Sequence, residues 1–181
     1  MVSTTEHVAL GQLVRKLEPQ GKLVRAWELK GGVSAQVTAL EVERPGGLIR
    51  KLVVRRHGPA DLGQNPNIAA DEFRLLQILQ PAGLPVPRPY YLDQSGEIFP
   101  TPYVVLEYLE GEPDFAPSDL PGCLRQMVGL LFRIHSVDPS RFELSFLPGQ
   151  DEKYDRKLKQ RPPRLDGSIG EGRIRDALEP A

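Results

Sequence analysis

The sequence predicts a soluble α+β protein of 181 residues, and three observations support this fold class. Hydrophobic residues make up 40% and charged residues 26%, which is typical of a folded globular chain. Three β-rich segments follow one another between residues 23 and 56, with only turn residues between them. Residues 68–79 and 120–135 instead carry apolar side chains at helical spacing. We therefore expect an antiparallel sheet with helices packed against it.

Turn residues and apolar spacing place each element in order. Thr4 or Thr5 can cap a helix that ends near Leu17, before Pro19 and Gly21. The residues between the expected helices are rich in glycine and proline, which favours turns and extended links. We expect five strands, at 23–29, 37–42, 48–56, 90–92 and 102–109; a loop at 58–67; two further helices, at 68–79 and 120–135; and the start of another helix at 173–178.

Charge, cysteine content and hydropathy exclude several classes of protein. The formal net charge of -1 argues against a protein that neutralises many nucleic-acid phosphates. Cys123 is the single cysteine, which excludes an internal disulfide and a cysteine-rich zinc site. The apolar runs are too short to span a membrane, and the N-terminus lacks the pattern of a signal peptide. We expect a cytoplasmic protein that binds neither nucleic acid nor membrane.

The first candidate for a ligand site is the glycine turn at residues 31–32. Gly31 and Gly32 would let the backbone approach a phosphate closely, and the Ser34 hydroxyl could donate a hydrogen bond to it. The turn is not a Walker A motif, because no Gly-Lys-Ser/Thr follows. Taken alone, the pattern favours an ordinary tight hairpin.

Arg55 and Glu72 form the second candidate pair. Arg55 lies near the end of an expected strand, where a guanidinium could hold phosphate oxygens or could simply face solvent. Glu72 stands at the N-terminal end of the apolar stripe of the 68–79 helix, so burying it would require a cationic partner. Stabilisation by the helix dipole is the alternative explanation for Glu72. We favour an ion pair between Glu72 and a strand cation.

The remaining reactive residue types carry little signal. His7, His57 and His135 are dispersed and have no second ligand at metal-binding spacing. No Gly-x-Ser-x-Gly motif of a serine hydrolase is present, and Cys123 has the setting of a structural residue. The basic stretch 153–164 holds one aromatic residue, so a solvated face or loop is favoured there over a nucleic-acid surface.

The order of these motifs resembles the aminoglycoside phosphotransferase and choline kinase-like superfamily, which has a protein-kinase-like fold. A glycine turn, a strand cation, a helix glutamate and an apolar strand ending in glycine follow one another as in a kinase small lobe. The resemblance covers most of residues 20–140. It rests on the segments LKGGVSAQV (29–37), LVVRR (52–56), EFRLLQIL (72–79), VPRP (86–89), YVVLEYLEG (103–111) and LLFRIHSVDP (130–139).

The resemblance implies ATP as the cofactor and gives roles to individual residues. Gly31, Gly32 and Ser34 would lie over the phosphates. Arg55 would replace the lysine that pairs with the α- and β-phosphates, which keeps the charge but changes the hydrogen-bond geometry. Glu72 would orient Arg55. Leu106 would lie behind the adenine. The Glu107 carbonyl and the Leu109 amide would form hydrogen bonds with the edge of the adenine.

One motif that the resemblance implies is missing from the sequence. The family's catalytic loop, His-Gly-Asp with an Asn some five residues on, does not occur, nor does the later Asp of the Mg²⁺ site. We therefore expect residues 1–110 to be a nucleotide-binding small lobe and 111–181 a hinge with the truncated beginning of a helical lobe. The parent protein would phosphorylate a hydroxyl group, and this chain would be inactive. Its hydroxyl acceptor cannot be named from these residues.

Two other interpretations stay open at this point. The chain could be a non-catalytic nucleotide- or partner-binding module, in which apolar residues of the 120–135 helix drive self-association. It could also be a general α+β domain with an ordinary hairpin at Gly31-Gly32, and Arg55 and Glu72 would then lie far apart.

Overall fold

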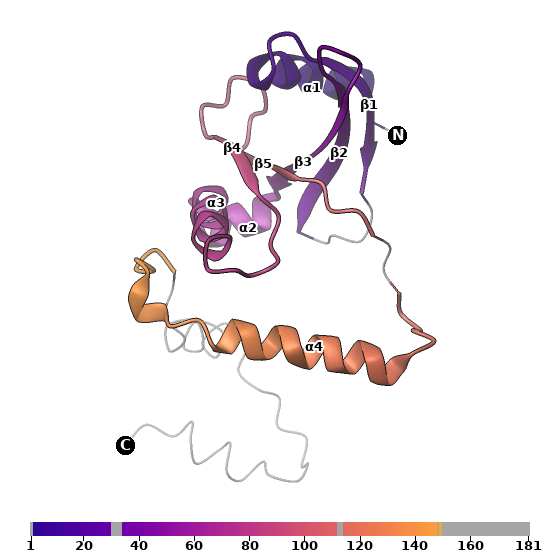
Figure 1. The fold of residues 1–181 in the computed structure, drawn as a ribbon. Helices are drawn as coiled ribbons and strands as arrows, with labels where there is room; N and C mark the ends of the chain where they lie inside the picture. Colours follow the sequence, from indigo (N-terminus) through magenta and orange to yellow (C-terminus); the bar gives the residue numbers. More distant parts are fainter. Residues whose placement is uncertain (1, 30–33, 112–113, 148, 150–181) are drawn as a thin grey trace, which may run out of the picture. The chain divides into compact units, whose positions relative to one another are not determined.

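A computed structural model describes residues 2–29, 34–111, 114–147 and 149, and it contains a single five-stranded antiparallel sheet (Figure 1). The strands lie in the order β1-β2-β3-β5-β4, so the first three form a meander, and β5 inserts between β3 and β4. Their bounds are β1 Lys22–Glu28, β2 Ala35–Glu43, β3 Ile49–His57, β4 Pro89–Asp93 and β5 Tyr103–Glu107. The helices are α1 Thr4–Leu17, α2 Pro59–Gln64, α3 Ile68–Leu79 and α4 Leu120–His135, followed by a 3₁₀ turn at Pro139–Arg141.

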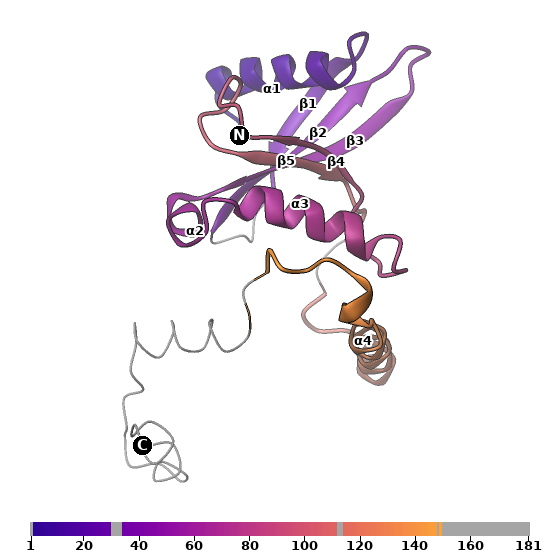
Figure 2. The same ribbon diagram turned by 90° about the vertical axis from the view of Figure 1, so that its left-hand side faces the viewer.

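The sheet has a helix on each face (Figure 2). Because side chains alternate along a strand, β3 sends Leu52 and Val54 to one face and Val53 to the other. The first face packs against α1 in a cluster that also holds Tyr103 of β5. The second face packs against α3 through residues that include Val104 of β5. Both faces of β3 and β5 are therefore buried at the centre of the sheet, which explains the apolar runs at residues 52–54 and 103–106.

Alternation along β3 also decides where its charged residues lie. Arg55 follows Val53 by two residues, so it belongs to the α3 face of the sheet. In the sheet register, Arg55 stands between Val37 of β2 and Val104 of β5. The α3 face therefore carries both an apolar cluster and a strand cation, and it is the face on which the candidate site is built.

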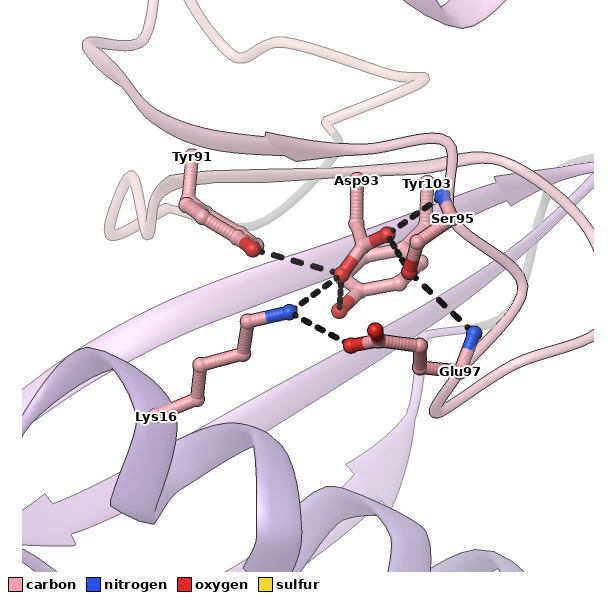
Figure 3. A network of polar contacts seen from close by, with 6 residues as sticks. All are labelled: Lys16, Tyr91, Asp93, Ser95, Glu97 and Tyr103. Atoms are coloured by element: carbon pink, nitrogen blue, oxygen red, sulfur yellow. Dashed lines mark hydrogen bonds and ion pairs between the residues drawn. The ribbon is translucent and has the colours of Figure 1, made fainter.

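A buried carboxylate joins α1 to β4, the edge strand at the other end of the sheet from β1 (Figure 3). Asp93, at the end of β4, is 4% exposed. Its carboxylate accepts hydrogen bonds from the Ser95 hydroxyl at 2.6 Å, from the Tyr103 hydroxyl at 3.0 Å and from the Lys16 ammonium of α1 at 3.1 Å. Lys16 also meets Glu97 at 3.3 Å. This network is the main polar tie between α1 and the β4–β5 hairpin.

The expected elements are present, with one addition. All five strands lie within two residues of their expected bounds, and the 68–79 and 120–135 helices match α3 and α4. The expectation of a loop across 58–67 is wrong, because residues 59–64 form α2. Pro59 begins this helix and Asp61 lies in its first turn, two features that favour a helix start.

Two expectations about the C-terminal part are not tested. The helix expected at 173–178 lies outside the described residues, and the division at residues 110 and 111 stays a prediction. Every labelled element belongs to the compact unit Met1–Leu144. No helix in the described part of the chain is long and apolar enough to cross a membrane.

Candidate functional site

Arg55 and Glu72 form an ion pair on the α3 face of the sheet, as the sequence predicts. Nη1 of Arg55 lies 3.0 Å from Oε1 of Glu72. The Arg55 side chain is 38% exposed and that of Glu72 19%, so the pair lies at the surface of the apolar cluster. Phe73 and Leu76 of α3 pack into that cluster and fix the helix on the sheet, which brings Glu72 over β3. The interpretation that keeps these two residues far apart is therefore wrong.

The second oxygen of Glu72 is held by a residue that sequence reasoning missed. Nε2 of His57 lies 2.8 Å from Oε2 of Glu72, and Nδ1 lies 3.6 Å from a carboxylate oxygen of Asp61 in α2. The His57 side chain is 3% exposed. One sequence signal could have found it, because His57 follows Arg55 by two residues and so lies on the same face of β3. A search for metal ligands overlooks such a contact.

Arg55 keeps hydrogen-bond donors that the described residues do not use. Its Nε is buried and has no hydrogen-bond partner in the described part of the chain. A buried guanidinium donor without a partner is costly unless a ligand or water meets it. The guanidinium is therefore placed to bind an anionic ligand while Glu72 neutralises part of its charge.

An apolar floor lies beside Arg55 in the same layer. Val53 and Leu106 are paired across β3 and β5 and are 9% and 6% exposed. Leu29, which follows β1, and Val37 of β2 pack against the same cluster. These aliphatic side chains therefore form one apolar cluster beside Arg55, and apolar side chains are the usual lining of a site for an aromatic ring.

The segment after β5 is fastened to the sheet by several contacts. Tyr108 lies edge-on to Trp27 of β1, with 5.9 Å between the ring centroids. Lys51 of β3 donates to Glu110 at 2.6 Å and lies 5.3 Å from the Tyr108 ring centroid. The backbone of residues 107–110 is therefore held at the rim of the apolar floor.

Glu107 and Leu109 differ in their surroundings. The Glu107 amide donates to the Arg88 carbonyl at 2.8 Å, and its carboxylate accepts from the Arg88 amide at 3.0 Å. Its side chain is therefore committed to the neighbouring strand. The Leu109 side chain is 57% exposed. The side chains of these two residues are thus either hydrogen-bonded already or largely exposed, so a ligand contact at either position would come from the backbone.

The glycine turn can be placed only at its end. Gly31 and Gly32 lie outside the described residues. Ser34 is described, and its carbonyl accepts a hydrogen bond of 2.8 Å from the amide of Gly58. A Cβ on Gly58 would lie 2.6 Å from that carbonyl oxygen, so only glycine allows this approach. The end of the turn is therefore joined to the end of β3, one residue after His57.

Within the described ranges, no group of three or more His, Cys, Asp or Glu side chains could hold a metal ion.

Comparison with known proteins identifies the family. The model of the phosphotransferase enzyme family, APH, matches residues 26–177. The chain belongs to the phosphotransferase enzyme family. The matched range contains the end of β1, all of β2 to β5, α3 and α4, together with every residue of the candidate site.

Two known proteins show how this phosphotransferase-family chain relates to longer relatives. Over 117 residues it is 30% identical to a mouse protein named acyl-CoA dehydrogenase family member 10. The aligned region covers 61% of this chain and 11% of the mouse protein. A crystal structure from Ralstonia eutropha, provisionally described as an aminoglycoside phosphotransferase, matches with a TM-score of 0.59 at 18% identity. That match covers 88% of this chain and 49% of the other, and it confirms the α+β fold expected from the resemblance.

Proposed function

We propose that this chain is the ATP-binding N-terminal portion of a small-molecule kinase that transfers the γ-phosphate of ATP to a substrate hydroxyl. The observation that carries the proposal is the Arg55–Glu72 ion pair beside an apolar floor. Membership of the phosphotransferase enzyme family supports it. Residues 1–110 would form the nucleotide-binding lobe, and 111–181 the hinge and the beginning of a helical lobe.

The described residues fit a nucleotide. Arg55 would donate to the α- and β-phosphates, and its unused Nε favours such a ligand. The aliphatic floor around Val53 and Leu106 would receive the adenine, whose edge would meet the Glu107 carbonyl and the Leu109 amide. Gly31, Gly32 and Ser34 would cover the phosphates. Bound Mg²⁺ would neutralise phosphate charge, but the family's ligand motifs for it do not occur in this sequence.

Binding and turnover separate in this proposal. The sequence lacks the His-Gly-Asp loop with its Asn, which would supply the base that accepts the proton of the substrate hydroxyl. We therefore expect the chain to bind ATP without phosphorylating an acceptor. The acceptor is a small hydroxylated molecule whose class the small lobe does not specify.

Titration calorimetry with ATP and magnesium tests the proposal. Arg55→Ala should weaken ATP binding on the order of tenfold, because one charge-assisted contact to phosphate is lost. Arg15→Ala is the matched control, since it removes the same charge from α1 on the opposite side of the sheet. Absence of ATP binding at millimolar concentration by the unaltered protein would overturn the proposal.

A second candidate function follows from α4. Eight large apolar side chains of this helix are between 40% and 72% exposed. An apolar surface of this kind favours association, here with a second copy of the chain. They are Leu120, Leu124, Met127, Val128, Leu130, Leu131, Phe132 and Ile134. Light scattering across a dilution series separates the two candidates: a self-associating chain without ATP affinity supports the interaction module, whereas a monomer that binds ATP contradicts it.

A further inference from the structure

We infer that His57 is a positioning residue that keeps Arg55 available to phosphate by occupying one oxygen of Glu72. The inference rests on the proposed function, because it assigns Arg55 to the nucleotide. It adds a residue to the site and explains how an arginine can serve there in place of a lysine.

The geometry divides the Glu72 carboxylate between two side chains of β3. Oε1 faces Nη1 of Arg55 at 3.0 Å, and Oε2 faces Nε2 of His57 at 2.8 Å. An ionised carboxylate only accepts hydrogen bonds, so Nε2 of His57 carries the hydrogen. Each oxygen of Glu72 therefore has its own donor, and the two donors are two residues apart on one strand face.

An arginine beside a free carboxylate tends to take both oxygens at once. The planar guanidinium matches a carboxylate in a two-pronged pair, which commits two of its nitrogens. Such a pair exists in this chain, where Nε and Nη2 of Arg44 donate to the two oxygens of Glu18, each at 2.6 Å. Nη1 of Arg50 also donates to one of these oxygens at 2.7 Å, so a second donor that shares an oxygen with the arginine leaves the pair intact. Arg55 instead meets Glu72 through Nη1, and its Nε has no hydrogen-bond partner among residues 2–29, 34–111, 114–147 and 149. At Glu72 the second donor is a buried imidazole on the oxygen that Arg55 does not meet, whereas at Glu18 the Arg50 guanidinium shares the oxygen that Nη2 of Arg44 also meets.

The consequence concerns the donors that Arg55 has left for a ligand. With Oε2 taken by His57, Arg55 is oriented by the one contact through Nη1, and its partly exposed guanidinium keeps donors for phosphate oxygens. A lysine in the same place has a single ammonium group and cannot form the two-pronged pair. The histidine is therefore needed because the strand cation is an arginine.

Burial and the hydrogen bond to Glu72 fix the His57 ring. Its side chain is 3% exposed; Nδ1 lies 3.6 Å from the Asp61 carboxylate of α2 and has no hydrogen-bond partner in the described part of the chain. The next residue, Gly58, is bonded to Ser34 at the end of the glycine turn. A purely structural role for this buried ring would affect folding stability but would not depend on whether residue 55 is arginine or lysine.

A double-mutant cycle tests the inference through ATP affinity. His57→Ala should weaken ATP binding about tenfold, the effect of losing one charge-assisted contact. The same change in an Arg55→Lys background should have a clearly smaller effect. His57→Gln should restore most of the affinity, because its side-chain amide can donate to Glu72. Thermal unfolding of each variant identifies any loss caused by misfolding. Equal affinity of His57→Ala and the unaltered protein, or an equal loss in both backgrounds, would overturn the inference.

A crystal structure of the His57→Ala variant tests the same inference without nucleotide. We expect Arg55 to turn and face both Glu72 oxygens with two nitrogens, as Arg44 faces Glu18. An unchanged contact through Nη1 alone would overturn the inference even if the unaltered protein proves not to bind ATP. Failure to bind ATP would instead contradict the proposed function, so the two failures are distinguishable.

Discussion

Asp93 shows how a single residue can hold two elements of this fold together. Burial by itself would raise the pKa of the Asp93 carboxyl group. The hydroxyl and amide of Ser95, the Lys16 ammonium and the Tyr103 hydroxyl all donate to it, and together they hold its pKa well below the ordinary value. The ionised form is therefore the form that the folded protein stabilises.

The lowered pKa predicts acid sensitivity. A carboxyl group with a depressed pKa in the folded state contributes stability above its unfolded pKa of about 3.9 and loses it as pH falls toward the folded value. Asp93→Asn should lower the free energy of unfolding by about 2 kcal/mol at pH 7, because the side-chain NH₂ group of asparagine cannot accept the hydrogen bonds that one carboxylate oxygen now accepts. It should also flatten the decline in stability below about pH 4. Urea unfolding across pH measures both effects.

The control for this prediction uses the exposed partner of the same lysine. Glu97 contacts Lys16 at 3.3 Å, and its side chain is 72% exposed. Glu97→Gln should therefore change stability by less than about 1 kcal/mol. An equal loss in the Asp93 and Glu97 variants would show that the buried hydrogen bonds of Asp93 are not what matters.

Gly58 is a second residue whose identity fixes the local structure, because a Cβ atom there would clash with the Ser34 carbonyl oxygen. Gly58→Ala would place a methyl group against the Ser34 carbonyl oxygen, which must then move. We expect a loss of about 2 kcal/mol in stability and weaker ATP binding. Gly63→Ala is the control, since a Cβ there meets nothing within 4 Å. If Gly58→Ala binds ATP normally, the position of Ser34 does not contribute to the site.

At the scale of elements, the two faces of the sheet have separate tasks. α1 packs on one face and stabilises the fold, whereas α3 packs on the other and brings Glu72 to Arg55. A core change beneath α1 should therefore affect stability without affecting the site.

Leu13→Ala tests this separation. Leu13 is fully buried in the α1 cluster. Its truncation should cost about 3 kcal/mol in the free energy of unfolding, while ATP affinity at a temperature well below the transition stays unchanged. Val8→Ala is the matched change on the exposed side of α1, where the side chain is 57% exposed, and should cost less than about 0.5 kcal/mol. A large loss of ATP affinity in Leu13→Ala would show that the two faces are coupled.

The elements also show what sequence reasoning can and cannot reach. Strands and long helices were predictable because alternation and helical spacing are local signals, and Arg55 and Glu72 could be paired because an apolar stripe fixes where α3 lies. α2 was missed because its six residues are rich in glycine, proline and polar side chains. His57 was missed because a dispersed histidine has no metal-ligand spacing, although its place two residues after Arg55 puts it on the same face of β3.

At the scale of the whole molecule, the chain spans part of longer relatives. It covers 49% of the solved relative and 11% of the mouse protein, so the activity of any longer protein is a proposal built on the small lobe. The described site is the one that we propose binds the nucleotide, and the acceptor would be chosen by residues outside it. The central claim is therefore that ATP lies on the α3 face of the sheet beside Arg55.

Backbone amide NMR of the isotopically labelled chain during titration with ATP and magnesium tests this claim most directly. We predict that amide shifts concentrate at Ser34, at Arg55 and at residues 107–109, and that Arg55→Ala reduces them together. Saturable shifts confined to α1 or α4, or no shifts at millimolar ATP, would contradict the claim.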